Sequence, residues 1–210
     1  NAIVLKSDAN KINIALAKNI LDFKNYKIFS QNFFQNPKSS IQLITVKDFI
    51  SNKPFIVVLS GNEIFSLSYG NDDLFSQKSS FKFDTKPVGL TNIENNIFCL
   101  ILVDKIFVFS LEEGIIIKLS SFSTLGATSC FYYMNKKLLV GDMIESLIIY
   151  EYQENKSFNE VYRESHEISC SSCVFINDEL IFCADQNSYV YQLKLSQIKN
   201  YASNELIIER

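Results

Sequence analysis

The stretch ATSCFYYMNKKLLVGDMIESLIIYEYQENKSFNEVYR, residues 127–163, decides the fold. Its first two apolar runs are Ala127–Met134 and Leu138–Val140, and the next two runs are Ser146–Tyr152 and Phe158–Arg163. Short runs rich in Val, Ile, Phe and Tyr, separated by polar breaks, are typical of β-strands. The inner runs are apolar throughout, as expected for strands covered on both faces, whereas the last run is mixed. The stretch therefore predicts four strands with a polar outer strand.

The turn residues of this unit recur along the chain. An asparagine follows the first apolar run of each unit at Asn52, Asn95, Asn135 and Asn177. A second turn residue closes the next run at Gly61, Asp104, Asp142 and Asp185. A period of roughly 40–45 residues with four strands in each unit is typical of β-propeller blades. We predict an all-β fold, a β-propeller with four to five four-stranded blades in this chain and further blades outside it. Sandwich and barrel folds explain short strands but not the repeated period.

The repeat divides the chain into three parts. Four blades are expected in residues 41–196, and a loop with a last outer strand in residues 197–210. Residues 1–40 hold N-terminal strands and a hairpin from a preceding blade, predicted at Ile20–Phe23 and Tyr26–Phe29. A blade buries its faces only against neighbouring blades. We therefore expect either that the missing blades lie outside this chain, a piece of a longer polypeptide, or that five blades close the propeller.

The charge balance argues against two classes of partner. The 210 residues include 20 Lys and Arg and 23 Asp and Glu, for a net charge of −3. An extended basic footprint for nucleic acid or a polybasic membrane patch is not expected from this balance. No apolar run approaches the roughly 18 residues that suggest a membrane span. We expect no membrane partner, and nucleic-acid contact only through other proteins.

Few residues offer reactive chemistry. The single histidine, His166, lies in a polar stretch and is interpreted as a solvated loop residue. Cys170-Ser171-Ser172-Cys173 has the spacing of a zinc or redox pair, but only Cys183 and His166 are near enough in sequence to add ligands. Residues three apart on a strand face opposite sides of the sheet, so the thiols are interpreted as core residues. We expect no catalytic residue, no cofactor, no metal and no small-molecule substrate.

The most distinctive turn is Gly141-Asp142-Met143-Ile144-Glu145-Ser146. Glycine, aspartate and serine suit a tight turn with local hydrogen bonds. The alternative is that Asp142 and Glu145 lie at the rim of the blade and bind a partner. With Arg163 and Asp185, they form the set of candidate partner-binding residues.

The segment LLVGDMIESLIIYEY, residues 138–152, resembles a signature of one family, that of the cleavage and polyadenylation factor large subunit. This family also contains the large subunit of the UV-damaged-DNA-binding complex and the large propeller subunit of the branch-site-recognising spliceosomal factor. In these proteins a hydrophobic strand meets a small residue and Asp, followed by Ser and an apolar strand ending in Tyr. The matching positions are Val140, Gly141, Asp142, Ser146 and Tyr152.

The resemblance implies a non-enzymatic nuclear scaffold bound to other protein subunits. Gly141-Asp142-Met143 and Arg163 favour the damaged-DNA-binding type, which presents substrates to a cullin-type ubiquitin ligase in DNA repair. Glu145-Ser146 and Ala184-Asp185 favour the alternative, a subunit in pre-mRNA splicing or 3′-end processing. An unrelated propeller scaffold in trafficking is a further alternative.

Overall fold

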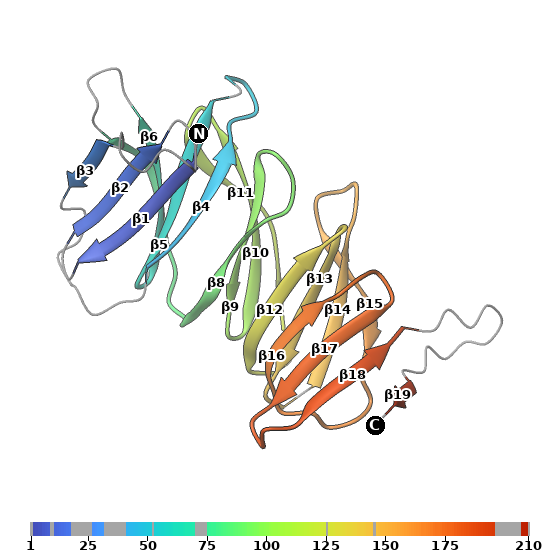
Figure 1. Ribbon diagram of the computed structural model, residues 1–210. Helices are drawn as coiled ribbons and strands as arrows, with labels where there is room; N and C mark the ends of the chain where they lie inside the picture. Colours follow the sequence, from blue (N-terminus) through green and yellow to red (C-terminus); the bar gives the residue numbers. More distant parts are fainter. Residues whose placement is uncertain are drawn as a thin grey trace.

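The computed structural model describes residues 2–8, 11–17, 27–31, 41–51, 53–69, 75–124, 126–144, 146–195 and 207–209. These residues form 19 strands in five sheets, and every strand pair is antiparallel. No helix occurs among them, and Figure 1 shows the four-stranded sheets standing side by side along the molecule. The prediction of an all-β fold is confirmed.

Four of the sheets have four strands, hydrogen-bonded in chain order. Blade 1 contains β4 (Ile41–Lys47), β5 (Pro54–Ser60), β6 (Glu63–Tyr69) and β7 (Phe75–Lys82). Blade 2 contains β8 (Pro87–Asn92), β9 (Ile97–Leu102), β10 (Lys105–Glu112) and β11 (Ile115–Ser123). Blade 3 contains β12 (Thr128–Met134), β13 (Lys137–Asp142), β14 (Ser146–Tyr152) and β15 (Phe158–Arg163). Blade 4 contains β16 (Cys170–Phe175), β17 (Leu180–Asp185), β18 (Val190–Lys194) and β19 (Ile207–Glu209).

The fifth sheet has three strands and precedes the blades in sequence. It comprises β1 (Ala2–Asp8), β2 (Lys11–Ala17) and β3 (Lys27–Gln31). The predicted hairpin strand Ile20–Phe23 lies outside the described residues. The four-stranded repeat itself agrees with the predicted propeller blades, and two strands of blade 3 have the predicted bounds.

The first strands of neighbouring blades run parallel to each other. Between β4 and β8, Gln42 Nε2 donates to the Leu90 carbonyl (3.2 Å), and further along Lys47 N donates to the Asn95 carbonyl (2.9 Å). Between blades 3 and 4, the turns that follow the first strands are joined by Asn135 Nδ2, which donates to Asp178 Oδ1 at 3.0 Å. The turns that join the first strand to the second therefore lie at the same end of neighbouring blades, and the turns that join the second strand to the third lie at the other end.

Two faces of the molecule follow from this arrangement. We call the end formed by the turns between the second and third strands the central-turn face; it includes the β13–β14 and β17–β18 turns. The opposite face carries the turns between the first and second strands, such as β4–β5 and β12–β13. In Figure 1 the β17–β18 turn lies at the lower end of blade 4.

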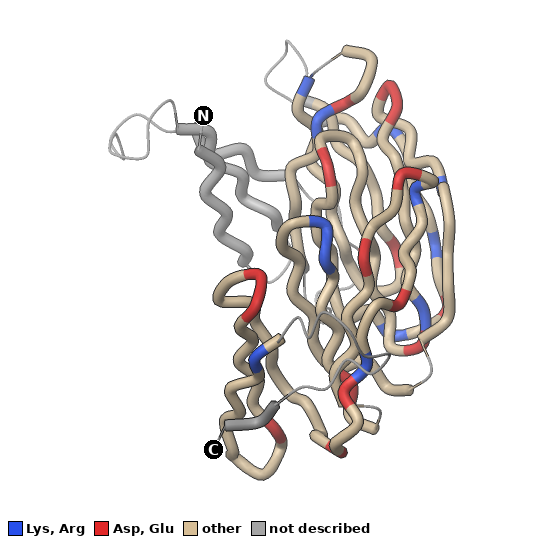
Figure 2. Tube along the Cα trace, turned by 90° about the vertical axis from the view of Figure 1, so that its right-hand side faces the viewer, with Lys and Arg blue, Asp and Glu red and all other residues tan. Residues whose placement is uncertain are grey.

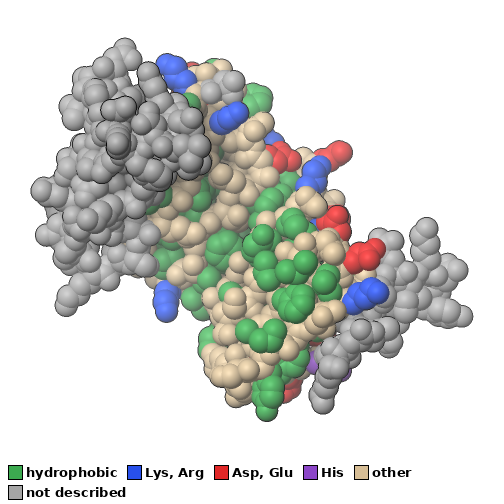
Figure 3. Space-filling model, in the orientation of Figure 1, with side chains coloured by type: hydrophobic (Ala, Val, Ile, Leu, Met, Phe, Trp, Pro, Cys, Tyr) green, Lys and Arg blue, Asp and Glu red, His purple; other side chains and the backbone are tan. Residues whose placement is uncertain are grey.

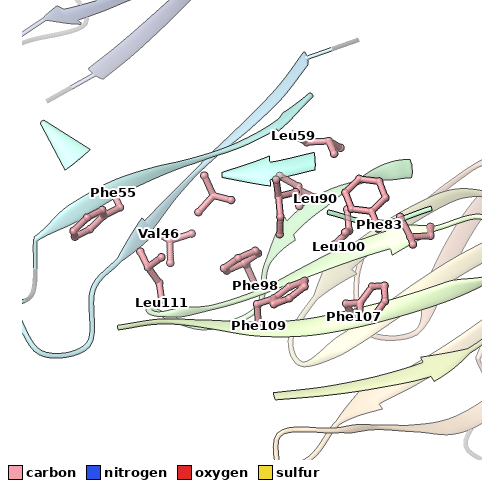
Figure 4. Packing of buried hydrophobic residues seen from close by; sticks show 13 residues of the cluster. Val46, Phe55, Leu59, Phe83, Leu90, Phe98, Leu100, Phe107, Phe109 and Leu111 are labelled. Atoms are coloured by element: carbon pink, nitrogen blue, oxygen red, sulfur yellow. The ribbon is translucent and has the colours of Figure 1, made fainter. Parts of the chain in front are cut away.

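The apolar runs are continuous because each central strand packs against a different blade on each side. In β13, Leu138 and Val140 join the hydrophobic cluster shared with blade 2, whereas Leu139 joins the cluster shared with blade 4. Alternate residues of a strand point to opposite faces, so both faces must be apolar. Figure 4 shows the corresponding packing between blades 1 and 2, where Phe98 and Phe109 point into the space between the sheets.

Candidate interaction surface

The central-turn face is held together by hydrogen bonds between successive segments. Met143 N donates to the Ala127 carbonyl at 3.1 Å, and the Met143 carbonyl accepts from Ser169 Oγ at 3.0 Å. Gln186 N then donates to the Ser169 carbonyl at 3.1 Å. The chain of bonds joins the turns of blades 3 and 4 to the segment between them, so their relative positions are set.

Asp142 lies at this face, but its side chain is inside the turn. It is 1% exposed, and its Oδ1 accepts from Ile144 N at 2.7 Å. A Cβ on Gly126 would lie 2.4 Å from the same oxygen, so the glycine makes room for the carboxylate. Ser146, at the other end of the turn, has φ of 73°. The Asp142 carboxylate therefore shapes the β13–β14 turn.

Asp185 has the same role in blade 4. Its Oδ1 accepts from Asn187 N (2.8 Å) and Tyr189 N (2.9 Å), and its Oδ2 accepts from the Tyr191 hydroxyl at 2.9 Å. The side chain is buried. These bonds close the β17–β18 turn.

Arg163 reaches the same end of blade 3, since it pairs with Ile148 across the β14–β15 ladder. Its guanidinium makes a two-pronged contact with Glu160, at 2.9 Å from Nε and 2.7 Å from the second terminal nitrogen. Glu145 lies outside the described residues. The structure thus brings Asp142, Arg163 and Asp185 to one face, where both aspartates are buried and Arg163 is partly exposed.

Four exposed residues of this face are apolar, beside the exposed polar residues Gln186, Asn187 and Ser188, and sequence reasoning missed these four. Met143 and Ile144 are 42% and 70% exposed, and Tyr189 and Val190 are 64% and 70% exposed. In the orientation of Figure 1, Figure 3 shows hydrophobic side chains reaching the surface at the lower end of the molecule. In the β13–β14 turn the signal was the apolar pair directly after the turn aspartate, and in blade 4 it was the apolar pair four and five residues after Asp185.

On the opposite face, the β4–β5 turn is built in the same way as the β13–β14 turn, around a buried aspartate. Asp48 is buried, its Oδ2 accepts from Ser51 N (2.7 Å) and Ser51 Oγ (2.6 Å), and Phe49 and Ile50 between them are exposed. This turn follows the first strand of blade 1, so it provides a built-in comparison for the central-turn face.

His166 is exposed, in agreement with its interpretation as a loop residue. The buried Glu164 organises the loop: its Oε1 accepts from His166 N at 2.9 Å and lies 2.7 Å from Nδ1. Glu164 Oε2 accepts from the Tyr162 hydroxyl at 3.0 Å. The histidine and glutamate therefore form a local loop contact.

The expectation that Cys170 and Cys173 face opposite sides of the sheet is wrong. Both are buried, because a β-bulge between Cys170 and Ser172 shifts the register and returns the two side chains to one face. Their sulfur atoms meet that of Cys130 from blade 3, and all three lie within 4.8 Å of one another.

Charged residues do not form a stripe of one sign on the described part of the chain. Figure 2 shows lysines and arginines interspersed with aspartates and glutamates along the blades. A mixed surface of this kind lacks the basic patch that phosphate-backbone binding requires.

The pKa of Asp185 is lowered from its ordinary value of 3.8. Burial raises the pKa, but the hydrogen bonds from Tyr189, Tyr191 and Asn187 favour the charged form and outweigh it. A lowered pKa in the folded state contributes stability that is present above pH 3.8 and is lost as the pH falls below that value.

Asp185→Asn is therefore expected to destabilise the protein at pH 7 and to have a smaller effect at pH 3, because pH 3 lies below the ordinary pKa of 3.8, where the unfolded wild-type chain takes up the proton and the charge stabilises the folded state less. Urea unfolding of both proteins at the two pH values measures this. A difference between them that stays constant with pH would contradict the role of the Asp185 charge.

Four-stranded antiparallel sheets in a regular repeat, packed face to face, define a scaffold of the β-propeller class. Residues 47–206 match the CPSF A subunit region, and the chain belongs to the CPSF A family. No curated protein matches the chain. Family members are in general scaffold-type, non-catalytic subunits of multiprotein complexes and are typically nuclear. Because the chain belongs to this family, the alternative of an unrelated propeller scaffold in trafficking is excluded.

Among the described residues, no helix has the length and the apolar character needed to cross a membrane.

Proposed function

We propose that this chain is a non-enzymatic scaffold in a nuclear complex and that its central-turn face docks a protein subunit. The exposed pairs Met143-Ile144 and Tyr189-Val190, presented on turns braced from inside, carry the proposal. Met and Tyr are enriched at protein interfaces, and clustered exposed apolar residues mark binding sites. A turn that is already ordered loses little conformational freedom when a partner binds.

The complex we favour is of the damaged-DNA-binding type, in which the propeller is an adaptor for a cullin ubiquitin ligase. Its support is the resemblance at Gly141-Asp142-Met143 together with Arg163. Nucleic acid is reached through partner proteins, which accords with the net charge of −3 and the interspersed charges in Figure 2.

A second candidate is a subunit of the splicing or 3′-end processing machinery. Glu145-Ser146 and Ala184-Asp185 favour it, since they match the splicing member of the family more closely. Both candidates use the same scaffold and differ in the subunits bound.

The test compares Ile144→Asp with Ile50→Asp in the full-length protein. Both isoleucines are exposed, and both lie two residues after a buried turn aspartate, but on opposite faces. A charge placed in an apolar contact should reduce recovery of the docked subunit by roughly tenfold or more, equivalent to about 1.4 kcal/mol. The measurement is affinity purification from nuclear extract with quantitative mass spectrometry.

Cullin-ligase components that depend on Ile144 would support the damaged-DNA-binding type, and splicing or cleavage factors would support the second candidate. Equal recovery with wild type and Ile144→Asp would contradict docking at the central-turn face. Equal losses with Ile144→Asp and Ile50→Asp would also contradict it, because the effect would then not depend on the face.

A further inference from the structure

Three thiols from two blades converge in the interface between β12 and β16. The Cys130 sulfur lies 3.7 Å from the Cys170 sulfur and 3.5 Å from the Cys173 sulfur. Each of the five cysteines of the chain is free, so none of these sulfur atoms is held in a disulfide. The group lies outside the central-turn residues described above.

The spacing of these sulfur atoms matches that of thiolates on one metal ion. Zinc–sulfur bonds are about 2.3 Å, which places two thiolates of a tetrahedral site about 3.8 Å apart. Soft thiolate ligands select zinc or copper(I) over harder ions. The observed separations of 3.5 and 3.7 Å therefore need only small adjustments to surround an ion.

The backbone around the thiols is shaped to bring them together. Gly141 is the cross-strand partner of Cys130, and a Cβ at Gly141 would lie 2.4 Å from the Cys130 sulfur and 2.7 Å from the Cys170 sulfur. The sulfur atoms thus occupy the space that the side chain of any other residue at position 141 would fill. β-Bulges beside Cys130 and beside Cys170 turn both side chains into this space.

Polar contacts next to the thiols join the three strands that surround them. Ser129 Oγ donates to the Cys170 carbonyl of blade 4, and it lies 3.1 Å from the Gly141 carbonyl. Contacts of this kind around a metal site orient the ligand-bearing strands.

A fourth ligand is available nearby on the same face of blade 4. Cys183 is the direct cross-strand partner of Cys173, is buried, and belongs to the same hydrophobic cluster as the three thiols. Residues directly opposite in a ladder have Cβ atoms about 4.5–5.5 Å apart and share a face. Cys183 is therefore the candidate for the fourth ligand, which would complete the four-sulfur tetrahedral set of structural zinc sites.

We propose that Cys130, Cys170 and Cys173, with Cys183 in the fourth position, form a structural zinc site that joins blade 3 to blade 4. The ligands come from both sides of the interface, so a bound ion holds the two sheets together. Each thiol that binds zinc releases its proton to solvent as the thiolate–metal bond forms.

The experiment compares the full-length protein with Cys130→Ser and Cys99→Ser, all purified under reducing conditions. Cys99 is the control, because it is buried in the interface between blades 2 and 3, away from the cluster. Metal analysis by plasma mass spectrometry should find one equivalent of zinc fewer per chain in Cys130→Ser than in wild type and in Cys99→Ser. Cobalt(II) added to the stripped wild-type protein should produce a thiolate-to-cobalt absorption band that Cys130→Ser lacks.

A measurement on the wild-type protein alone covers the case in which Cys130→Ser does not fold. Chelation under reducing conditions should lower the midpoint of thermal unfolding, and zinc should restore it, because an ion that binds only the folded state stabilises that state. Equal zinc in wild type and Cys130→Ser, or no cobalt–thiolate band in wild type, would overturn the proposal. Copper(I) bound in place of zinc would overturn the assignment of the ion.

Discussion

Replacing Phe109 with alanine is expected to lower the free energy of unfolding by about 3–5 kcal/mol. Phe109 lies fully buried between blades 1 and 2, with its ring 5.4 Å from that of Phe98 and 5.0 Å from that of Phe81. The substitution removes most of a large side chain and leaves a cavity that rigid sheets on both sides cannot fill by collapsing. It also removes two aromatic contacts, of which the one with Phe81 joins blade 2 to blade 1.

Chemical denaturation followed by circular dichroism measures this loss, and Phe49→Ala is the matched control. Phe49 is 74% exposed in the β4–β5 turn, so the same exchange there should change stability by no more than about 0.5 kcal/mol. Equal stability of the Phe109→Ala and Phe49→Ala proteins would contradict the burial of Phe109 between blades 1 and 2.

Gly114→Ala is expected to lower the free energy of unfolding by about 2–4 kcal/mol, from two causes. Gly114 has φ of 82°, a conformation that an L side chain adopts only at a cost. The added Cβ would also lie 2.6 Å from the ring of Phe55 in blade 1. Phe55 is buried in the core between the blades, so its ring has little room to move away.

The reverse exchange in a different turn, the β12–β13 turn of blade 3, separates these two causes. Lys136 has φ of 65° and is exposed, so Lys136→Gly relieves strain without loss of packing. We expect it to raise stability by a few tenths to about 1 kcal/mol in the same denaturation experiment. A Gly114→Ala protein with wild-type stability would contradict the close approach of the β10–β11 turn to blade 1.

The candidate surface was only partly predictable. The turn residues Asp142 and Asp185 could be recognised from the sequence, because Asp favours turns through hydrogen bonds to its own backbone. The same bonds bury their carboxylates, and this leaves Ile144 and Val190 as exposed neighbours. Which side chain of a turn reaches solvent depends on the packing of adjacent turns, and those turns are far apart in the sequence.

The cluster of Cys130, Cys170 and Cys173 was even less predictable from the sequence than the candidate surface. Strand alternation places residues 170 and 173 on opposite faces, and the β-bulge next to Cys170 reverses that result. A single extra residue in a ladder leaves no clear trace in the pattern of apolar residues. The third thiol, Cys130, lies in another blade, so its approach follows from how the sheets stack.

The amino-acid sequence by itself determined that the chain is a series of four-stranded antiparallel units. Strand periodicity and turn chemistry are local properties, and continuous apolar runs such as Leu138–Val140 already require cover on both faces. Only the tertiary structure decided which turns share a face, which side chains on that face meet solvent, and which sulfur atoms converge. These depend on ladder register and on contacts between blades, and both join residues about 40 positions apart, beyond the reach of any local pattern.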